Sequence, residues 1–354
     1  MSKESKIKDF DPNSAASAGG NIFGLPFTTE EAAIVLIPVP WDVTVSYSDG
    51  TSKGPQAIFD ASVQVDLFDP MVSASWKIGV AMEEISKNVL SWNTRLRKKA
   101  SAYIRNLEKG VSEHTPSMRK IGDEINKGCE DLKKTVKETA KKHLEKGKIV
   151  GLVGGDHSTP LGFIEALAER NPDFGILHID AHCDLRKAYE GFEYSHASIM
   201  YNALKNPQIK KMVQVGIRDW CEEENKYITS SNGRIKTFFD YRMKNELHEG
   251  KSWKTICDEI ISHLPPLVYL SFDIDGLDPK LCPDTGTPVP GGLEFEQAVF
   301  LITQLVKSGK KIIGFDLNEV APGKNQWNGN VGARMLFKMC NLTAVSNGLA
   351  TFNP

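Results

Sequence analysis

The sequence predicts an α/β fold in which a parallel sheet is covered by helices on both faces. Short runs rich in Val, Ile and Leu recur along the chain without alternating apolar and polar residues, which is typical of strands buried on both sides. Amphipathic stretches such as Pro160–Arg170 and Phe295–Ser308 lie between them. Because strands alternate with helices, the pattern indicates one α/β domain.

The elements are expected in a simple order along the chain. Residues 1–30 are polar and are predicted to form an N-terminal arm, and residues 31–354 a single domain. The weakest of the predicted strands is Arg234–Phe239. The other predicted strands are Ala33–Val39, Lys148–Val153, Phe174–Ile179, Met212–Ile217, Leu267–Phe272 and Lys311–Phe315.

A charged segment at about 90–147 interrupts this alternation. It is rich in Lys, Glu and Arg, and its apolar residues recur at helical spacing, which predicts two or three helices broken near Thr115-Pro116. We interpret it as a helical insertion. A solvated surface layer and an oligomer contact are both open as its role.

The composition excludes several classes of protein. The 354 residues are 40% hydrophobic and 25% charged, unlike collagen-like, wholly disordered or disulfide-scaffold chains. The net charge of −2 gives no basic surplus, so no nucleic-acid partner is expected. No apolar run approaches the roughly 20 residues that span a bilayer. The N-terminus does not resemble a secretory signal, and the six scattered cysteines form no C-x-x-C pair, which predicts reduced thiols in a cytoplasmic protein.

Polar clusters follow four of the predicted strands at the point where each strand ends. They are Gly154–Ser158, Asp180–Asp184, Asp273–Pro279 and Asp316–Pro322. In open α/β sheets, ligands bind outside the carboxyl ends of the strands. The clusters therefore predict a ligand site at this edge of the sheet.

The spacing within these clusters predicts a metal centre. In extended chain, alternate side chains share a face, so Asp180, His182 and Asp184 point the same way, and so do Asp273 and Asp275. Carboxylates gathered in a partly buried place repel one another unless cations neutralise them. The predicted ligands are His157, Asp180, His182, Asp184, Asp273 and Asp275. Six such ligands suffice for two divalent metals, and His and carboxylate ligands without thiolate suit Mn, Ni, Fe or Zn.

The first three clusters resemble the signature motifs of the ureohydrolase family, which contains arginases, agmatinases, guanidinobutyrases, guanidinases and formimidoylglutamases. The similarity runs from about residue 33 to the C-terminus, and Gly54–Ile58 also resembles a family segment. The resemblance implies a three-layer α/β/α fold with a mainly parallel, eight-stranded sheet. It implies a binuclear centre, usually Mn²⁺ with Ni²⁺ as an alternative, that hydrolyses a guanidino or formimino C–N bond.

The family's metal roles carry over position by position. His157 and Asp184 would bind one metal, His182 and Asp275 the other, and Asp180 and Asp273 would bridge the two. When bound, two such metals lower the pKa of a shared water. Asp275 would also steer that water by a hydrogen bond.

Two further residues match family positions that act on the substrate. Glu319 matches the glutamate that holds the guanidinium, a planar cation that pairs bidentately with a carboxylate. A helix-capping or ion-paired glutamate is the alternative. His196 lies near the place of the histidine that moves a proton to the leaving nitrogen. Without the family context, His196 would be interpreted as a surface residue.

The motifs predict the reaction better than the substrate. Val320-Ala321-Pro322 after Glu319 resembles agmatinases more than arginases, which favours agmatine, hydrolysed to putrescine and urea. Arg186 resembles instead a residue of formimidoylglutamases. If it faces the pocket, its charge favours a substrate with a carboxylate tail, whereas a structural salt bridge is the alternative. Guanidine, guanidinobutyrate and formimidoylglutamate therefore stay open, with arginine the least favoured.

The remaining expectations concern rivals and partners. Pocket aromatics are predicted to narrow the site, and the candidates are Trp41, Tyr47, Tyr189, Phe192 and Tyr194. The resemblance implies a trimer or hexamer acting on a small guanidino or formimino molecule, with no membrane partner. A non-hydrolytic metal-binding scaffold and a deacetylase-like or phosphoesterase hydrolase are the rival classes, and the presence of Glu319 argues against both.

Overall fold

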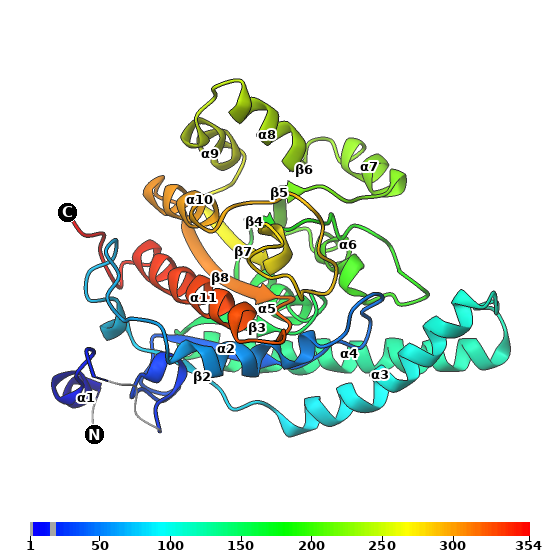
Figure 1. The fold of residues 1–354 in the computed structure, drawn as a ribbon, viewed down its shortest axis with the longest axis horizontal. Coiled ribbons are helices and arrows are strands. Elements are labelled where there is room, and N and C mark those ends of the chain that lie inside the picture. The colour runs from blue at the N-terminus through cyan, green and yellow to red at the C-terminus, as the bar shows by residue number, and fades with distance from the viewer. Residues whose placement is uncertain (1–2, 15–18) are drawn as a thin grey trace.

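The computed structural model describes residues 3–14 and 19–354. Its centre is a sheet in which all eight strands are parallel (Figure 1). The strands are β1 (Ile34–Val39), β2 (Val80–Met82), β3 (Ile149–Gly154), β4 (Phe174–Ile179), β5 (Ile209–Ile217), β6 (Ile235–Phe239), β7 (Leu267–Asp273) and β8 (Lys311–Asn318). The predicted α/β fold with a parallel sheet is confirmed. The strand β2 was not predicted, because three residues at a sheet edge leave no periodic signal.

The strand order explains where a site can form. The order is β2-β1-β3-β8-β7-β4-β5-β6. The four strands followed by polar clusters, β3, β8, β7 and β4, are therefore consecutive neighbours in the middle of the sheet. Since all of them are parallel, their carboxyl ends meet at one edge, and the polar clusters that are far apart in sequence come together there.

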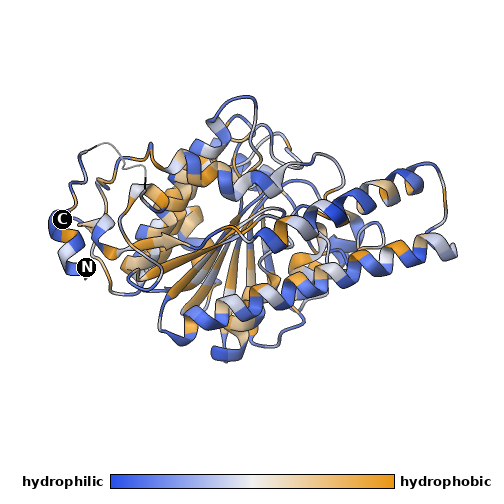
Figure 2. Cartoon of the chain, turned by 90° about the horizontal axis from the view of Figure 1, so that it is seen from below, coloured by the Kyte–Doolittle hydropathy of each residue, from blue (hydrophilic) through white to orange (hydrophobic). Residues whose placement is uncertain are grey.

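Helices cover both faces and make the structure three-layered. The helices are α1 (Lys3–Asp9), α2 (Gly54–Ser62), α3 (Lys87–Glu108), α4 (Pro116–Glu145), α5 (Leu161–Arg170), α6 (Ile199–Ala203), α7 (Glu222–Thr229), α8 (Asp240–His248), α9 (Trp253–Ser262), α10 (Phe295–Lys307) and α11 (Trp327–Ser346). One apolar core lies under α2, α9, α10 and α11, and a second lies under α3, α4, α5 and α6. Figure 2 shows the strands as an apolar layer between helices whose outer faces are hydrophilic.

The predicted insertion is a pair of long antiparallel helices. The helix α3 ends at Glu108, and α4 begins after Thr115, whose side-chain oxygen accepts a hydrogen bond from the Met118 backbone N–H. Half of the pair packs on the sheet layer, while its far end projects beyond the rest of the molecule (Figures 1 and 2). One face of α4 is buried at Ile125, Leu132 and Val136, as the helical spacing predicted.

The N-terminal segment is more closely packed than its polar composition indicated. Ile22, Phe23, Leu25 and Phe27 are buried in the core beside α2 and β2, although residues 15–18 lie outside the described part of the chain. Burying these four apolar side chains against distant core residues stabilises the packed segment, although the rest of the segment is polar. All six cysteines are free thiols. Across the described residues, no helix is both long and apolar enough to cross a membrane.

Candidate metal centre and substrate pocket

The six predicted metal ligands come together at the carboxyl edge of the central strands. His157 follows β3, Asp180, His182 and Asp184 follow β4, and Asp273 and Asp275 stand at the end of β7. Five of the six are buried, with exposed fractions of 5% or less, whereas His182 keeps 23% of its side chain exposed. The strand order brings these side chains into one cluster. The predicted extended alternation does not hold throughout, because Asp184 has a φ of +55° and Asp275 lies in a short 3-10 helix after β7.

The imidazole of His157 lies among three carboxylates. Its Nδ1 is 3.0 Å from Asp180 Oδ2, 3.3 Å from Asp184 Oδ2 and 3.2 Å from Asp273 Oδ2. Its Nε2 lies 2.9 Å from the hydroxyl of Ser271. Ser271 donates its single hydroxyl proton to Asp316, so its oxygen accepts the Nε2 proton of His157. The lone pair on Nδ1 then faces the three carboxylates.

This arrangement fits a metal cation. A proton on Nδ1 can satisfy one of the three carboxylates, whereas a divalent cation can be bound by the nitrogen and the oxygens together. Burial alone would lower the pKa of His157, but hydrogen bonds to the carboxylates of Asp180, Asp184 and Asp273 raise it well above its usual value. The site therefore attracts positive charge strongly.

A second set of ligand atoms shares Asp180 with the first. The Nδ1 of His182 lies 3.1 Å from Asp275 Oδ2 and 3.6 Å from Asp180 Oδ1. Ligand atoms of His157, Asp180 and Asp184 form one compact group, and those of Asp180, His182 and Asp275 form another. Because Asp180 belongs to both groups, two cations bound here would be neighbours.

The raised pKa values of two carboxyl groups also support metal binding. Burial, followed by the charges of Asp275 and Asp180, raises the pKa of Asp273 well above its usual value. Burial and the charge of Asp180 raise the pKa of Asp184 to about 6. Buried carboxyls that repel one another are stable as anions only with a counter-charge. This cluster fits metal binding for that reason.

The sequence analysis did not single out His178, which lies in the same cluster. Its Nε2 is 2.8 Å from Asp180 Oδ2, and its Nδ1 is 3.0 Å from the side-chain amide nitrogen of Gln214. That amide nitrogen also donates to the backbone carbonyl of Cys183 at 2.8 Å, which identifies it as the nitrogen end. His178 therefore accepts at Nδ1 and donates from Nε2 to Asp180, which orients this carboxylate. Its spacing of two residues from Asp180 was the available signal.

Glu319 lies directly beside His157 in an unusual backbone conformation. Its φ is +63°, a region that non-glycine residues rarely adopt outside functional sites. Its Oε1 accepts a hydrogen bond from the backbone N–H of His157 at 2.9 Å, while its buried Oε2 has no partner among the described residues. A Cβ added at Gly286 would come within 2.8 Å of Oε2, so a larger residue at this position would crowd the oxygen.

The surroundings of Glu319 make its ionised form unfavourable without a cation nearby. Burial, followed by the charge of Asp156, raises the pKa of Glu319 well above its usual value. Neither predicted alternative fits: Glu319 caps no helix, and it forms no ion pair within the described part of the chain. A buried carboxylate with one oxygen that has no hydrogen-bond partner suits a planar cation.

A small pocket of about 150 Å³ opens next to the ligands. Its walls include His182, Asp184, Arg186, Tyr189 and His196, together with residues of three other loops. The predicted site residues His196 and Arg186 thus both line it. Burial, and then the charge of His182, lowers the pKa of His196 to about 4, so the imidazole is neutral near pH 7.

Arg186 points into this pocket without a structural ion pair. Its guanidinium carbon lies 4.8 Å from the centroid of the Tyr189 ring, and no carboxylate among the described residues pairs with it. Nearby acids have other contacts: Glu224 accepts hydrogen bonds from the Leu185 and Cys221 backbone N–H groups, and Asp219 Oδ2 lies 4.0 Å from His182 Nε2. The charge of Arg186 is therefore available to a ligand.

Of the five aromatics predicted to narrow the pocket, one does so. Tyr189 lines it, whereas Trp41 and Phe192 are fully buried in the core and Tyr47 is 82% exposed. Tyr194 packs under the ammonium of Lys133, which lies 5.0 Å from its ring centroid. Sequence position alone placed these residues near the site, but the direction of each side chain depends on the fold.

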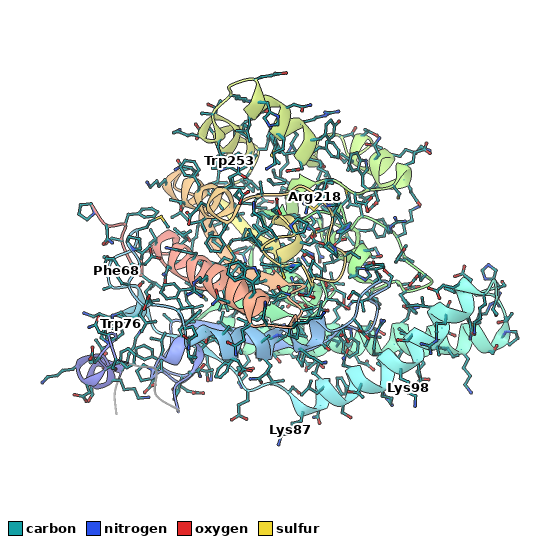
Figure 3. The ribbon with its side chains drawn as sticks, viewed as in Figure 1. Phe68, Trp76, Lys87, Lys98, Arg218 and Trp253 are labelled. Carbon is teal, nitrogen blue, oxygen red and sulfur yellow. The ribbon has the colours of Figure 1, made fainter. Side chains whose placement is uncertain are left out.

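Arg218 is a second residue that the sequence analysis missed. Its guanidinium donates hydrogen bonds to four backbone carbonyls, including that of Asp275 at 2.6 Å and that of Val289 at 3.0 Å. Figure 3 shows Arg218 inside the molecule, whereas Lys87 and Lys98 project outward from α3. Arg218 therefore connects the segment that carries Asp275 to the loop that covers the pocket, a role without a local sequence signal.

Comparisons with known proteins agree with the fold and the site. Residues 32–341 match the model of the Arginase family. An N(1)-aminopropylagmatine ureohydrolase of Thermus thermophilus is 32% identical over 293 residues, which cover 83% of this chain and 84% of the relative. An agmatinase of Bacillus anthracis is 27% identical over 297 residues, covering 83% of this chain and 85% of the relative.

Solved structures show the same fold at lower identity. The agmatine ureohydrolase of Thermoplasma volcanium superimposes with a TM-score of 0.67 at 23% identity, covering 96% of this chain and 97% of that one. The proclavaminate amidino hydrolase of Streptomyces clavuligerus superimposes with a TM-score of 0.69 at 20% identity, covering 94% of this chain and all of that one.

The buried His and Asp cluster fits metal binding, and the family match defines the class of the enzyme. This chain belongs to the Arginase family. It is a ureohydrolase, an enzyme that hydrolyses linear amidines, and members of the family act on small guanidino substrates.

Proposed function

We propose that this enzyme hydrolyses the guanidino C–N bond of a small substrate and releases urea, with Glu319 as the residue that binds the guanidinium. The observation that carries this proposal is the buried Oε2 of Glu319, which has no hydrogen-bond partner among the described residues. A guanidinium stays charged at every physiological pH and presents paired N–H groups to a carboxylate.

We propose two divalent metals as cofactors, Mn²⁺ first and Ni²⁺ as the alternative. His157, Asp180, Asp184 and Asp273 would hold one, and His182, Asp180, Asp273 and Asp275 the other. When bound, the two metals lower the pKa of a shared water and so supply a nucleophile near neutral pH. The donor set of imidazoles and carboxylates suits both metals.

We assign substrate positioning and proton transfer to residues of the chain itself. Glu319 holds the guanidinium so that its carbon faces the metal ligands, which turns a bimolecular attack into a positioned one. Asp275 accepts a hydrogen bond from the attacking water. His196 begins the cycle neutral because its pKa is lowered to about 4 by burial and by the charge of His182. As a neutral base, it would accept a proton that the attacking water releases and pass that proton to the leaving nitrogen.

Agmatine is the first substrate that we propose, because curated relatives are named agmatinase and N(1)-aminopropylagmatine ureohydrolase. A guanidino acid such as 4-guanidinobutyrate is the second, and Arg186 favours it. This unpaired cation lines the pocket, where it attracts a carboxylate tail and repels an ammonium tail. The small pocket also keeps guanidine among the candidates, and the charge of Arg186 keeps formimidoylglutamate, which carries carboxylates.

The proposal is tested by replacing Glu319 with Gln. Urea and ammonia release would be measured with agmatine, arginine, 4-guanidinobutyrate, 3-guanidinopropionate, guanidine and formimidoylglutamate, after loading with Mn²⁺ or Ni²⁺. We expect Glu319→Gln to lower kcat/KM for the best guanidino substrate by on the order of 10³-fold, since it removes a buried charge partner. Bound metal should not change. Asp278→Asn, which alters a carboxyl in the β7 motif that is not among the proposed ligands, is the matched control.

Two outcomes would contradict the proposal. Full guanidino hydrolysis by Glu319→Gln would exclude the assigned role of this glutamate. Inactivity of the metal-loaded wild type on all six compounds would favour a non-hydrolytic role.

We further propose that the enzyme is a cytoplasmic trimer or hexamer. The proposal rests on likeness to the family and on the reduced thiols. Light scattering that finds only a species of about 39 kDa, the mass of one chain, would contradict it.

A further inference from the structure

The segment that carries Arg186 and His196 is shaped by a tight turn. Tyr189 and Phe192 exchange two backbone hydrogen bonds of 3.1 and 2.9 Å. Between them, Glu190 and Gly191 both have positive φ, at 52° and 78°. Two consecutive residues of this kind make the two-residue turn that joins paired strands. A short turn on a loop is free to move unless other elements hold it.

A residue of the helical insertion holds this turn. The side-chain amide nitrogen of Asn126, on α4, donates to the backbone carbonyl of Gly191 at 3.1 Å. Its side-chain oxygen accepts from the backbone N–H of Glu193 at 2.9 Å. One side chain thus bonds the loop as a neighbouring strand would, with a donor and an acceptor together. Among residues of this length, Asn alone supplies both.

Packing from the same two helices supports the contact. The ring of Tyr103, on α3, lies 5.3 Å from the ring of Phe192. A Cβ at Gly191 would come within 2.7 Å of the Tyr103 hydroxyl, so the turn lies against the helix. The ammonium of Lys133, on α4, lies 5.0 Å from the ring of Tyr194 and 3.2 Å from Glu165.

The turn connects these helices to the pocket through Tyr189. The ring of Tyr189 lies 4.8 Å from the guanidinium carbon of Arg186 and 6.3 Å from the ring of His196 in an edge-on arrangement. The position of Tyr189 therefore sets the space available to both side chains. Every step from Asn126 to His196 is a contact between ordered groups.

We propose that the α3–α4 helices form the outer support of the substrate pocket, and that Asn126 is a positioning residue that fixes Tyr189 and, through it, Arg186 and His196. The inference rests on the proposed function, in that it assigns the pocket to a guanidino substrate. It gives the helical insertion a role in substrate selection. Asn126 acts on the tail of the substrate and on proton transfer, without contact with the metal ligands.

The test compares Asn126→Ala and Asn126→Asp with the wild-type, metal-loaded enzyme. Asn126→Asp keeps the acceptor for Glu193 but loses the donor to Gly191, so its effect should be intermediate. Lys134→Ala is the control, because Lys134 is an exposed residue of the same helix whose ion pair, within the described part of the chain, is with Glu130. Hydrogen exchange of residues 189–194, metal content and kinetics per bound metal would be measured.

For Asn126→Ala, we expect exchange in residues 189–194 to accelerate by roughly tenfold or more, because two hydrogen bonds are lost. We expect kcat/KM for the best tailed substrate to fall by on the order of tenfold to a hundredfold, as misplacement of a positioned group does. The value for guanidine, which has no tail, should fall less. Metal content should be unchanged.

The outcomes separate this inference from the proposed function. Unchanged exchange in residues 189–194, or unchanged kinetics per metal with only a lower Tm, would overturn the role of Asn126. If the wild type hydrolyses none of the six compounds, the proposed function fails. The exchange measurement then still shows whether Asn126 holds the turn. If residues 189–194 exchange as slowly in Asn126→Ala as in the wild type, Asn126 does not hold the turn.

Discussion

The carboxyl edge of the sheet and the helix α4 use charged residues in opposite ways. At the sheet edge, Asp180, Asp184 and Asp273 surround one imidazole in a buried place, and the protein supplies few counter-charges. On α4, lysines meet carboxylates at the surface. These pairs are Lys127–Asp131, Lys134–Glu130, Lys137–Glu169 and Lys141–Glu169, at 2.8 to 2.9 Å.

The difference teaches how to tell a functional charge from a structural one. Exposed ion pairs balance themselves and are screened by water, so each contributes little to stability or to binding. Buried carboxylates without partners raise one another's pKa and remain costly until a cation arrives. Arg186 belongs with the second kind, although its sign is opposite, since it lines a pocket without a carboxylate partner in the described structure.

The largest effect is expected from Asp273→Asn. In the metal-loaded enzyme, loss of this ligand should reduce bound metal and lower kcat/KM by on the order of 10³-fold. In the metal-free protein, the same change should increase the free energy of unfolding at pH 7, because burial and neighbouring carboxylates make the ionised Asp273 unfavourable. Urea release, elemental analysis and denaturation with and without chelator measure the three quantities.

The sign of the metal-free effect follows from the pKa of Asp273. Burial and neighbouring carboxylates raise this pKa above its usual 3.8, so the ionised form destabilises the folded state. The penalty is absent below pH 3.8, grows as the pH rises from 3.8 to the folded-state pKa, and stays constant above it. Asp131→Asn, on α4, is the control and should leave metal content unchanged. If the metal-free Asp273→Asn protein were less stable than wild type at pH 7, the claim that the buried carboxylates destabilise the metal-free protein would be wrong.

A smaller effect is expected from Arg186→Gln. Removing the cation should lower kcat/KM for 4-guanidinobutyrate relative to agmatine by about tenfold to a hundredfold, because a carboxylate tail loses its partner and an ammonium tail loses a repulsion. The ratio of the two values is the measurement. Arg242→Gln is the matched control, since Arg242 also stacks on aromatic rings but lies outside the pocket. An unchanged ratio would place Arg186 with the structural charges.

The smallest effect is expected from Glu169→Gln, which removes the pairs with Lys137 and Lys141. Because these groups are partly exposed, the free energy of unfolding should fall by less than about 1 kcal/mol, and less at high salt. Hydrogen bonds from Lys137 and then Lys141 lower the pKa of Glu169 to about 2.

This lowered pKa sets the direction of the pH dependence. The stabilisation is complete above the unfolded-state value of 4.5 and is lost as the pH falls towards 2. Denaturation of both proteins from pH 6 to pH 3 would measure it. A difference between wild type and variant that widens as the pH falls would refute the assignment.

The sequence by itself determined the fold class and the candidate ligands, because both depend on local patterns. Apolar runs that do not alternate indicate buried parallel strands. A spacing of two residues after a strand singled out Asp180, His182 and Asp184 as candidates, although Asp184, with a φ of +55°, departs from the extended chain that the prediction assumed. The break at Thr115 and the buried stripe of α4 were predictable for the same reason.

The tertiary structure decided what depends on contacts between distant segments. The strand order made β3, β8, β7 and β4 neighbours and so joined four separate motifs into one site. Folding also placed Arg186 in the pocket and Trp41 in the core. It brought Asn126 into contact with the turn at Gly191. Such contacts join residues tens of positions apart, so the local sequence around a side chain does not predict its partner in the folded protein.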